Sequence, residues 1–222
     1  MNFNKKNIFA VNKPIGPTSF DIVEEIRKIT GIKKVGHGGT LDPLAEGVLV
    51  VGVGRDATKK LFEITSREKE YIVTIKFGET SRTDDKEGEK TKISEKKPTE
   101  EEVKKVVKKF IGEIDQIPPN FSAVKVQGKR AYKSARKGEK INLQPRQITI
   151  KKIEILSYNY PRLKLKVITG KGVYIRSLAR DIGEELGVGG YVLKLKRTRI
   201  GDFKLEDSIN LEELKNKIAG GI

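Results

Sequence analysis

A strand-like alternation in KEYIVTIKFG, residues 69–78, is the feature that most constrains the fold of this chain. In an extended strand with this pattern, one face collects the side chains of Tyr71, Val73, Ile75 and Phe77. Strand patterns also occur in residues 8–14, 48–53, 146–158, 162–170 and 191–201. This many strands exclude a helical bundle and require a sheet.

Helical patterns are interspersed among these strands in an irregular order. Residues 17–31 have an apolar stripe at helical spacing, with Thr18 or Ser19 as the N-cap and Gly31 as the end. Thr99 and Glu102 have the spacing of a capping box at the start of another helix. Further helices are expected over 56–64, 174–187 and 211–218, a loop over 32–47, and an exposed polar excursion over 79–98. The pattern predicts an α+β fold with a mixed sheet in one domain.

The chain is strongly basic, with 46 Lys or Arg against 30 Asp or Glu and a net charge of +16. Residues 121–152 hold ten basic residues and one acidic residue, a local net charge of +9. Such a concentration favours a polyanionic partner, nucleic acid first and an anionic membrane second. Phe121 and Tyr132 among these charges favour RNA or DNA, and a solvated basic face is the alternative.

Several classes of protein are disfavoured by what the sequence lacks. No apolar window of 18 residues is present, and the first residues do not resemble a signal peptide, so we expect a cytoplasmic protein. With no cysteine and one histidine, neither a disulfide framework nor a catalytic zinc site of the usual kinds is expected. Gly52, Gly54 and Ala57 match G-x-G-x-x-A, but the acidic residue that a dinucleotide site needs after the next strand is absent.

One bare loop lies within VGHGGTLDPLAEGVLVVGVGRDATK, residues 35–59. It holds the single histidine, His37, among glycines, and it holds Asp42 directly before Pro43. A proline biases the preceding residue toward extended or turn conformations, so the Asp42 carboxylate is well held for use as a nucleophile or base. An ordinary Asp-Pro turn is the alternative. The residues alone therefore indicate a basic α+β protein with a candidate acidic site.

Six further segments accompany this loop in a fixed order: VNKPIGPTSFD, EKEYIV, GETSRTDDKEGE, IPPNFSAVKVQGKRAY, GKGVYIRSLARDIGEELG and YVLKLKRTRIG. Together with the loop they closely resemble the motifs of the TruB family of tRNA pseudouridine synthases, over residues 8 to about 205. The resemblance implies a pseudouridine synthase fold, with a mixed, mainly antiparallel central sheet flanked by helices and RNA-binding loops. It also implies a single catalytic domain over residues 1–222, with an RNA-binding insertion around 112–146.

The resemblance implies catalytic roles for three residues. Asp42 would be the nucleophile that isomerises a uridine from an N1 to a C5 glycosidic link, attacking either the base or the ribose. Arg176 would pair with that carboxylate and hold it ionised, with phosphate binding as its alternative role. Tyr71 would stack on the flipped uracil, and its phenol could help to remove the C5 proton, with a core-facing tyrosine as the alternative.

Other residues would bind the RNA. His37 would wedge into the space that the extruded uridine leaves in the T loop. Lys13 would support the active-site loops or contact phosphate, and Asp85 could pair with a basic group or guide the RNA. The remaining expected RNA-binding residues are Leu195, as the apolar wall of the pocket, with Gly39, Lys129, Arg130 and Tyr132.

The expected activity is isomerisation of the uridine at position 55 of tRNA, by a monomer that contacts the T arm and uses neither a cofactor nor a metal. The chain departs from the family in reading His37-Gly38-Gly39, where the family usually has Thr or Ser after the histidine. It is also expected to lack the C-terminal PUA domain of many relatives. An RNA chaperone or tRNA-binding module with little turnover is the alternative function.

Overall fold

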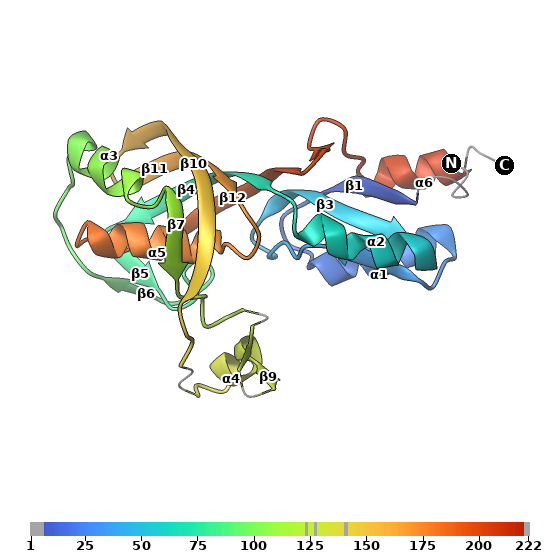
Figure 1. Ribbon diagram of the computed structural model, residues 1–222, viewed down its shortest axis with the longest axis horizontal. Coiled ribbons are helices and arrows are strands. Elements are labelled where there is room, and N and C mark those ends of the chain that lie inside the picture. The colour runs from blue at the N-terminus through green and yellow to red at the C-terminus, as the bar shows by residue number, and fades with distance from the viewer. Residues whose placement is uncertain (1–6, 123, 127, 140–141, 220–222) are drawn as a thin grey trace. The chain divides into compact units, whose positions relative to one another are not determined.

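The computed structural model describes residues 7–122, 124–126, 128–139 and 142–219. The chain divides into two compact units, Met1–Ile72 with Leu195–Ile222, and Val73–Lys194 (Figure 1). Two strands, β4 (Lys69–Phe77) and β12 (Gly190–Ile200), contribute residues to both units. A single catalytic domain over 1–222 stays a prediction.

The first unit is built on a mixed sheet. Strand β3 (Glu46–Val53) pairs antiparallel with β1 (Ile8–Lys13) and with β2 (Val35–Gly38). It pairs in parallel with the end of β12, where Lys196 faces Glu46 and Arg197 faces Gly47. The short strand β13 (Phe203–Lys204) returns antiparallel along β12. The predicted α+β fold with a mixed sheet is thereby confirmed.

Three helices, α1 (Ser19–Thr30), α2 (Arg55–Thr65) and α6 (Leu211–Ala219), belong to this unit. Helix α1 begins as the sequence predicts, because Thr18 and Asp21 cap each other's backbone N–H groups reciprocally. It ends at Gly31, whose φ of 68° is the left-handed conformation that glycine adopts without strain. The local signals of a helix start and stop were therefore sufficient here.

The loop expected over residues 32–47 is wrong in part, because residues 35–38 form strand β2, with His37 opposite Val51. Two glycines of this strand, Gly36 and Gly38, face helix α2. A Cβ on Gly36 would lie 3.4 Å from the Leu61 side chain, and one on Gly38 would lie 3.3 Å from the Ile64 side chain. Gly38, where the family usually has Thr or Ser, thus faces helix α2 closely.

The second unit has the strand order β4, β11 (Arg162–Thr169), β10 (Arg146–Asn159) and β7 (Gly112–Gln116), and β10 runs antiparallel to both of its neighbours. Strand β4 alternates between buried and half-buried residues along its whole length, which confirms the opening pattern. Helices α3 (Glu100–Lys108) and α5 (Ile175–Glu185) belong to this unit, and Thr99 and Glu102 form the predicted capping box of α3.

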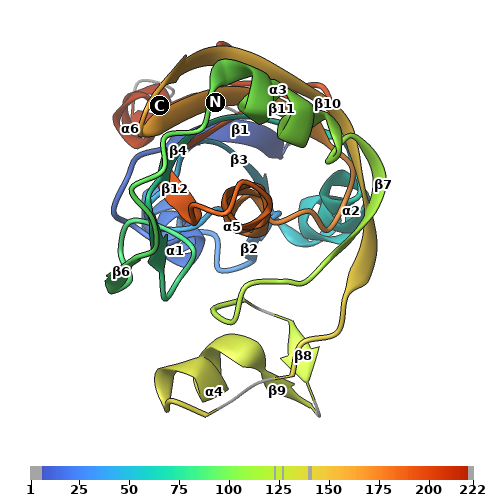
Figure 2. The ribbon, with the colours of Figure 1, turned by 90° about the vertical axis from the view of Figure 1, so that its left-hand side faces the viewer.

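The segment expected as a polar excursion carries a short hairpin of β5 (Glu79–Ser81) and β6 (Lys90–Lys92). The chain between β7 and β10 forms a small lobe of β8 (Lys125–Val126), β9 (Lys129–Arg130) and α4 (Ala131–Arg136), as Figure 2 shows. The lobe has an apolar cluster of its own, formed by Val124, Ala131 and Leu143 with Tyr174 against it.

Candidate active site

Asp42 lies in the connection between β2 and β3, and the backbone of this connection is held at every carbonyl from residue 39 to residue 43. The five acceptors are bonded as follows: Gly39 and Thr40 by Arg197 at 3.0 and 3.1 Å, Leu41 by the Ser19 hydroxyl at 2.9 Å, Asp42 by the Ala45 N–H at 3.0 Å, and Pro43 by the Gly16 N–H at 2.9 Å. The half-buried carboxylate of Asp42 is therefore carried on a segment whose path is fully specified.

The Ser19 hydroxyl serves this segment twice. It also accepts a hydrogen bond from the Leu41 N–H at 2.8 Å, so both polar backbone groups of the residue before Asp42 are bound by one side chain. Ser19 is buried at the first turn of α1, which fixes its own position. The sequence indicates Ser19 only as a possible cap of α1, because a contact to a residue 22 positions away has no local pattern.

Lys13 is fully buried at the end of β1, where its ammonium donates to the carbonyls of Pro14 and Pro17, both at 2.8 Å. Burial lowers the pKa of Lys13 to about 8, against the attraction of the Asp42 carboxylate, which raises it. The ammonium is therefore mostly charged at pH 7 and close enough to Asp42 to act on it. This geometry favours the first of the two expected roles, support of the active-site loops, over a contact to phosphate.

His37 lies on β2 and is half-buried, and its Nδ1 atom is buried without a hydrogen-bond partner among the described residues. Burial and the charge of Arg197 lower its pKa, so the ring is neutral at pH 7. Gly39 follows with a φ of 90°, a conformation that favours glycine. Tyr71 on β4 and Leu195 on β12 belong to the same unit and are 7% and 6% exposed.

Two further buried cations of the first unit were missed by the sequence analysis. The Lys69 ammonium donates to the carbonyls of Thr65 and Arg67, at 2.8 and 2.9 Å, and burial lowers its pKa to about 8. Arg197 is 1% exposed and also donates to the Val48 carbonyl at 2.8 Å. The one available signal for Arg197 was its spacing of two residues from Leu195, which places both on the same face of a strand.

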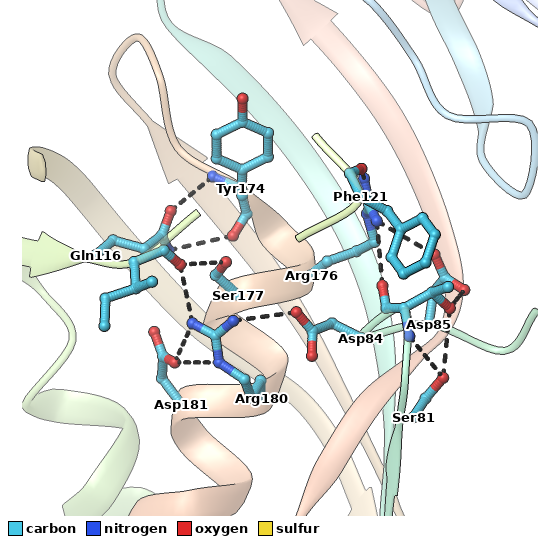
Figure 3. A network of polar contacts seen from close by, with 12 residues as sticks. Ser81, Asp84, Asp85, Gln116, Phe121, Tyr174, Arg176, Ser177, Arg180 and Asp181 are labelled. Carbon is cyan, nitrogen blue, oxygen red and sulfur yellow. Dashed lines mark hydrogen bonds and ion pairs between the residues drawn. The ribbon is translucent and has the colours of Figure 1, made fainter. Parts of the chain in front are cut away.

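Arg176 lies in the second unit, at the second residue of α5, and is 6% exposed (Figure 3). It donates to the carbonyls of Thr83 and Phe121 at 3.1 and 3.0 Å, and it lies 3.6 Å from the Asp85 carboxylate. The pairing of Asp85 with a basic group is thus confirmed. Pairing of Arg176 with Asp42 joins residues of the two units and stays a prediction.

Arg180, one turn further along α5, binds the same neighbourhood (Figure 3). It pairs with Asp84 at 3.0 Å and Asp181 at 2.8 Å, and it donates to the Ile117 carbonyl at 2.9 Å. Asp84 has a φ of 59°, which is unusual for a residue other than glycine. Burial raises the pKa of Asp84 to about 6, although the guanidinium groups of Arg180 and Arg176 oppose the shift.

Gln116 completes the connection between α5 and the insertion (Figure 3). Its side chain is buried, accepts from the Tyr174 N–H at 2.8 Å, and donates to the Tyr174 carbonyl at 3.2 Å. The Ser177 hydroxyl donates to the Ile117 carbonyl at 2.8 Å. The segment 116–121, in the first part of the expected insertion, is therefore bound to the turns of α5 that carry Arg176.

Within the insertion, Lys129 and Arg130 lie on β9, and their side chains are outside the described part of the chain. Tyr132 is half-buried, and its N–H donates to the Ser122 carbonyl at 3.0 Å. A hollow of about 500 Å³ is lined in part by Arg82, Phe121 and Asn142. The hollow is thus shared between the insertion and Arg82, which lies outside it.

Two observations concern ligands and membranes. Among the described residues, no three His, Asp or Glu side chains gather in a way that could hold a metal ion. Over the same residues, no helix is both long enough and apolar enough to cross a bilayer.

Two family models together match most of the chain. Residues 27–175 match the TruB family pseudouridylate synthase N-terminal domain, and residues 176–220 match the tRNA pseudouridylate synthase B C-terminal domain. The boundary between the matches falls directly before Arg176, inside α5.

Similar proteins carry the same description. A tRNA pseudouridine synthase B of Phocaeicola vulgatus is 46% identical over 96% of this chain and 93% of its own length. One of Bacteroides fragilis is 47% identical over 95% of this chain and 93% of its own length.

Solved structures with a related fold come from larger proteins. A chain of a Cbf5-Nop10-Gar1 complex matches with a TM-score of 0.73 and 32% identity, and a chain of an H/ACA RNP bound to a substrate RNA with 0.71 and 30%. Each match covers 94% of this chain, which spans about half the length of those proteins, 53% and 52%.

Proposed function

Because this chain belongs to the TruB family of pseudouridylate synthases, we propose that it isomerises the uridine at position 55 in the T loop of tRNA, with Asp42 as the nucleophile. Family membership establishes the class: the chain is a tRNA pseudouridine synthase, an isomerase. One observation supports the assignment of Asp42 most strongly: the backbone that carries it is held in place. All five carbonyls from residue 39 to residue 43 accept hydrogen bonds, and the Lys13 ammonium attracts the Asp42 carboxylate.

In this reaction the bond from N1 of uracil to C1′ of ribose breaks, and a bond from C5 to the same carbon forms. C5 loses its proton and N1 gains one, so the product is an isomer and no co-reactant is consumed. Asp42 forms a covalent bond to the base or to the ribose while the uracil turns. A carboxylate held in one place lowers the entropic cost of that attack.

Arg176 and Tyr71 complete the proposed chemistry. Arg176 pairs with Asp42 in the RNA-bound enzyme and keeps the carboxylate ionised, and its contacts to Asp85 and to two carbonyls hold the guanidinium in a defined orientation. Tyr71 stacks on the uracil and helps to remove the C5 proton. Leu195 forms the apolar wall beside the base, consistent with its buried place on β12.

RNA recognition falls to the basic insertion and to the His37 loop. Lys129, Arg130 and Tyr132 contact the T arm, and the local charge of +9 over residues 121–152 supports this assignment. His37 occupies the space that the extruded uridine leaves, and its neutral ring suits stacking between bases. Gly39 lets the RNA backbone approach, and we expect the enzyme to act as a monomer.

Release of tritium from C5-labelled uridine in a T-arm transcript tests the proposal. We expect the wild type to release tritium and Asp42→Asn to release at least about 10³-fold less, because loss of a nucleophile removes the covalent route. Both should bind the transcript with similar affinity. The matched control is Asp56→Asn, an exposed carboxylate on α2 that should leave the rate unchanged.

Equal and very low release by the wild type and Asp42→Asn, with binding intact in both, would overturn the assignment of Asp42. That result would favour the alternative function, an RNA chaperone or tRNA-binding module. Release at the wild-type rate from transcripts in which position 55 is not uridine would show instead that the target position is wrong.

A further inference from the structure

We propose that Arg197 is a positioning residue for the isomerisation, whose guanidinium holds the segment that carries Asp42. The inference rests on the proposed function, in which Asp42 is the nucleophile. Arg197 does not reach the substrate in this proposal; it acts through the backbone of residues 39 and 40.

The guanidinium spans two parts of the chain. Its Nε donates to the Val48 carbonyl in β3 at 2.8 Å, while Nη1 and Nη2 donate to Thr40 and Gly39 at 3.1 and 3.0 Å. One planar group therefore ties the loop to the central strand of the sheet with three hydrogen bonds. A lysine in its place has no planar fork and could not maintain all three contacts in this geometry.

The backbone of Arg197 is itself fixed beside the start of β3, just after the segment that carries Asp42. Arg197 pairs with Gly47 in the parallel register of β3 and β12. Gly47 has a φ of 108°, and a Cβ there would lie 2.2 Å from the Arg197 carbonyl oxygen. Only glycine allows this approach. The start of β3, residues 39 and 40 and Arg197 are therefore held together on either side of Asp42.

Charge distinguishes Arg197 from an ordinary core residue. No carboxylate among the described residues lies within ion-pair distance of it, and three carbonyls are its hydrogen-bond partners. Its positive charge lowers the pKa of Lys13, Lys69 and His37, so it lies among other basic groups. Burying such a group is costly, and an apolar residue would fill a purely structural position at a lower cost. The presence of an arginine here is consistent with a role at the site.

The test compares Arg197→Lys and Arg197→Met with the wild type on a T-arm transcript. We expect the single-turnover rate of tritium release to fall about 10- to 100-fold in both, because a small displacement of a reacting group has an effect of this size. The dissociation constant for the transcript should change by less than about 3-fold, so the effect falls on the rate and spares binding. Arg199→Lys and Arg199→Met are the controls, since Arg199 is on the same strand and is paired with Glu68.

Hydrogen exchange supplies a measurement that does not depend on activity. The Leu41 amide donates to the Ser19 hydroxyl and the Ala45 amide to the Asp42 carbonyl. Arg197→Lys loosens the segment between them and should speed the exchange of both amides, whereas Arg199→Lys should not. If Arg197→Met does not fold, Ser19→Ala takes its place in the test. It removes the neighbouring contact to the Leu41 carbonyl and should lower the rate in the same way.

A folded Arg197→Lys with a wild-type rate, or one that loses binding as strongly as rate, would overturn the positioning role. Unchanged exchange at Leu41 and Ala45 would also overturn it. If the wild type is itself inactive and Arg197→Lys still speeds exchange, Arg197 holds the loop as proposed. In that case only the proposed function is wrong.

Discussion

At the scale of single residues, the site combines a specified backbone with buried cations. Asp42 is half-buried. Three cations of the same unit, Lys13, Lys69 and Arg197, are buried. Each cation is bonded to carbonyl oxygens, and Asp42 is the carboxylate that most raises the pKa of Lys13. The charge state of this group of side chains should therefore decide how the enzyme responds to pH.

Lys13 should make activity fall as the pH rises. Its pKa is lowered to about 8, so its ammonium is lost near that pH and the support for Asp42 is lost with it. The rate at pH 9 should be about 10-fold below the rate at pH 7, measured as single-turnover tritium release. Lys13→Arg keeps its charge across this range, and we expect its profile to stay flat.

Lys69→Arg is the matched control, because Lys69 has the same lowered pKa but draws no contribution from Asp42. Its profile should keep the fall near pH 8. If the fall persists in Lys13→Arg and disappears in Lys69→Arg, the role given to Lys13 is wrong. The contribution of Lys13 to the free energy of unfolding should rise with pH, whereas the activity falls. Between about pH 8 and 10.5 the unfolded chain binds more protons at Lys13 than the folded chain does.

At the scale of elements, helix α5 organises the second unit. Its first turns carry Arg176 and Arg180, and through these it holds both the acidic turn at residues 83–85 and the start of the insertion at 116–121. The N-terminus of α5 has no side-chain cap of its own, and Gln116 binds the Tyr174 backbone there instead. The segment 116–121 is thereby linked mechanically to Arg176.

Asp84 should give this connection a dependence on pH. Its pKa is raised to about 6, so between about pH 4 and 6 the folded chain binds more protons there than the unfolded chain. The contribution of Asp84 to stability is thus present at low pH and falls as the pH rises through this window. Relative to the wild type, Asp84→Asn should gain about 1 to 3 kcal/mol in free energy of unfolding between pH 4 and 7.

Urea unfolding at several pH values measures this difference. Asp115→Asn, an exposed position on β7, is the control and should show no such trend. A constant difference between Asp84→Asn and the wild type across the range would show that Asp84 does not titrate as we expect.

At the scale of the whole molecule, charge is concentrated where the sequence places it. The net charge is +16, and residues 121–152 supply +9 of it. Elsewhere many lysines are paired with carboxylates, as Lys104 is with Glu100 at 2.6 Å. Binding of a polyanion should therefore depend on the insertion more than on the total charge.

The salt dependence of RNA binding tests this distribution. Lys129→Gln with Arg130→Gln should reduce the slope of log affinity against log salt by about 1 to 2, since each phosphate contact contributes about 0.7 to 0.9. Lys104→Gln should leave the slope unchanged. Equal reductions in both variants would show that the insertion has no special part in binding.

Features that depend on interactions between residues close in the sequence could be predicted, and features that depend on distant residues could not. The caps of α1 and α3 join residues three apart, and the alternation in β4 is internal to one strand, so both were predictable. Strand β2 was expected as a loop, because its glycines have low strand propensity and only the pairing with β3 and the packing of α2 stabilise it. Tertiary contacts overrode the local preference there.

The sequence by itself determined the family, the fold class and Asp42 as the candidate nucleophile, because ordered motifs and residue chemistry are local properties of the chain. The tertiary structure alone decided what holds the backbone around Asp42. Arg197 reaches Gly39 and Thr40 across 158 and 157 residues, and Ser19 reaches Leu41 across 22. No local pattern encodes such hydrogen bonds, since they exist only once strand register and helix packing bring distant backbone groups to one place.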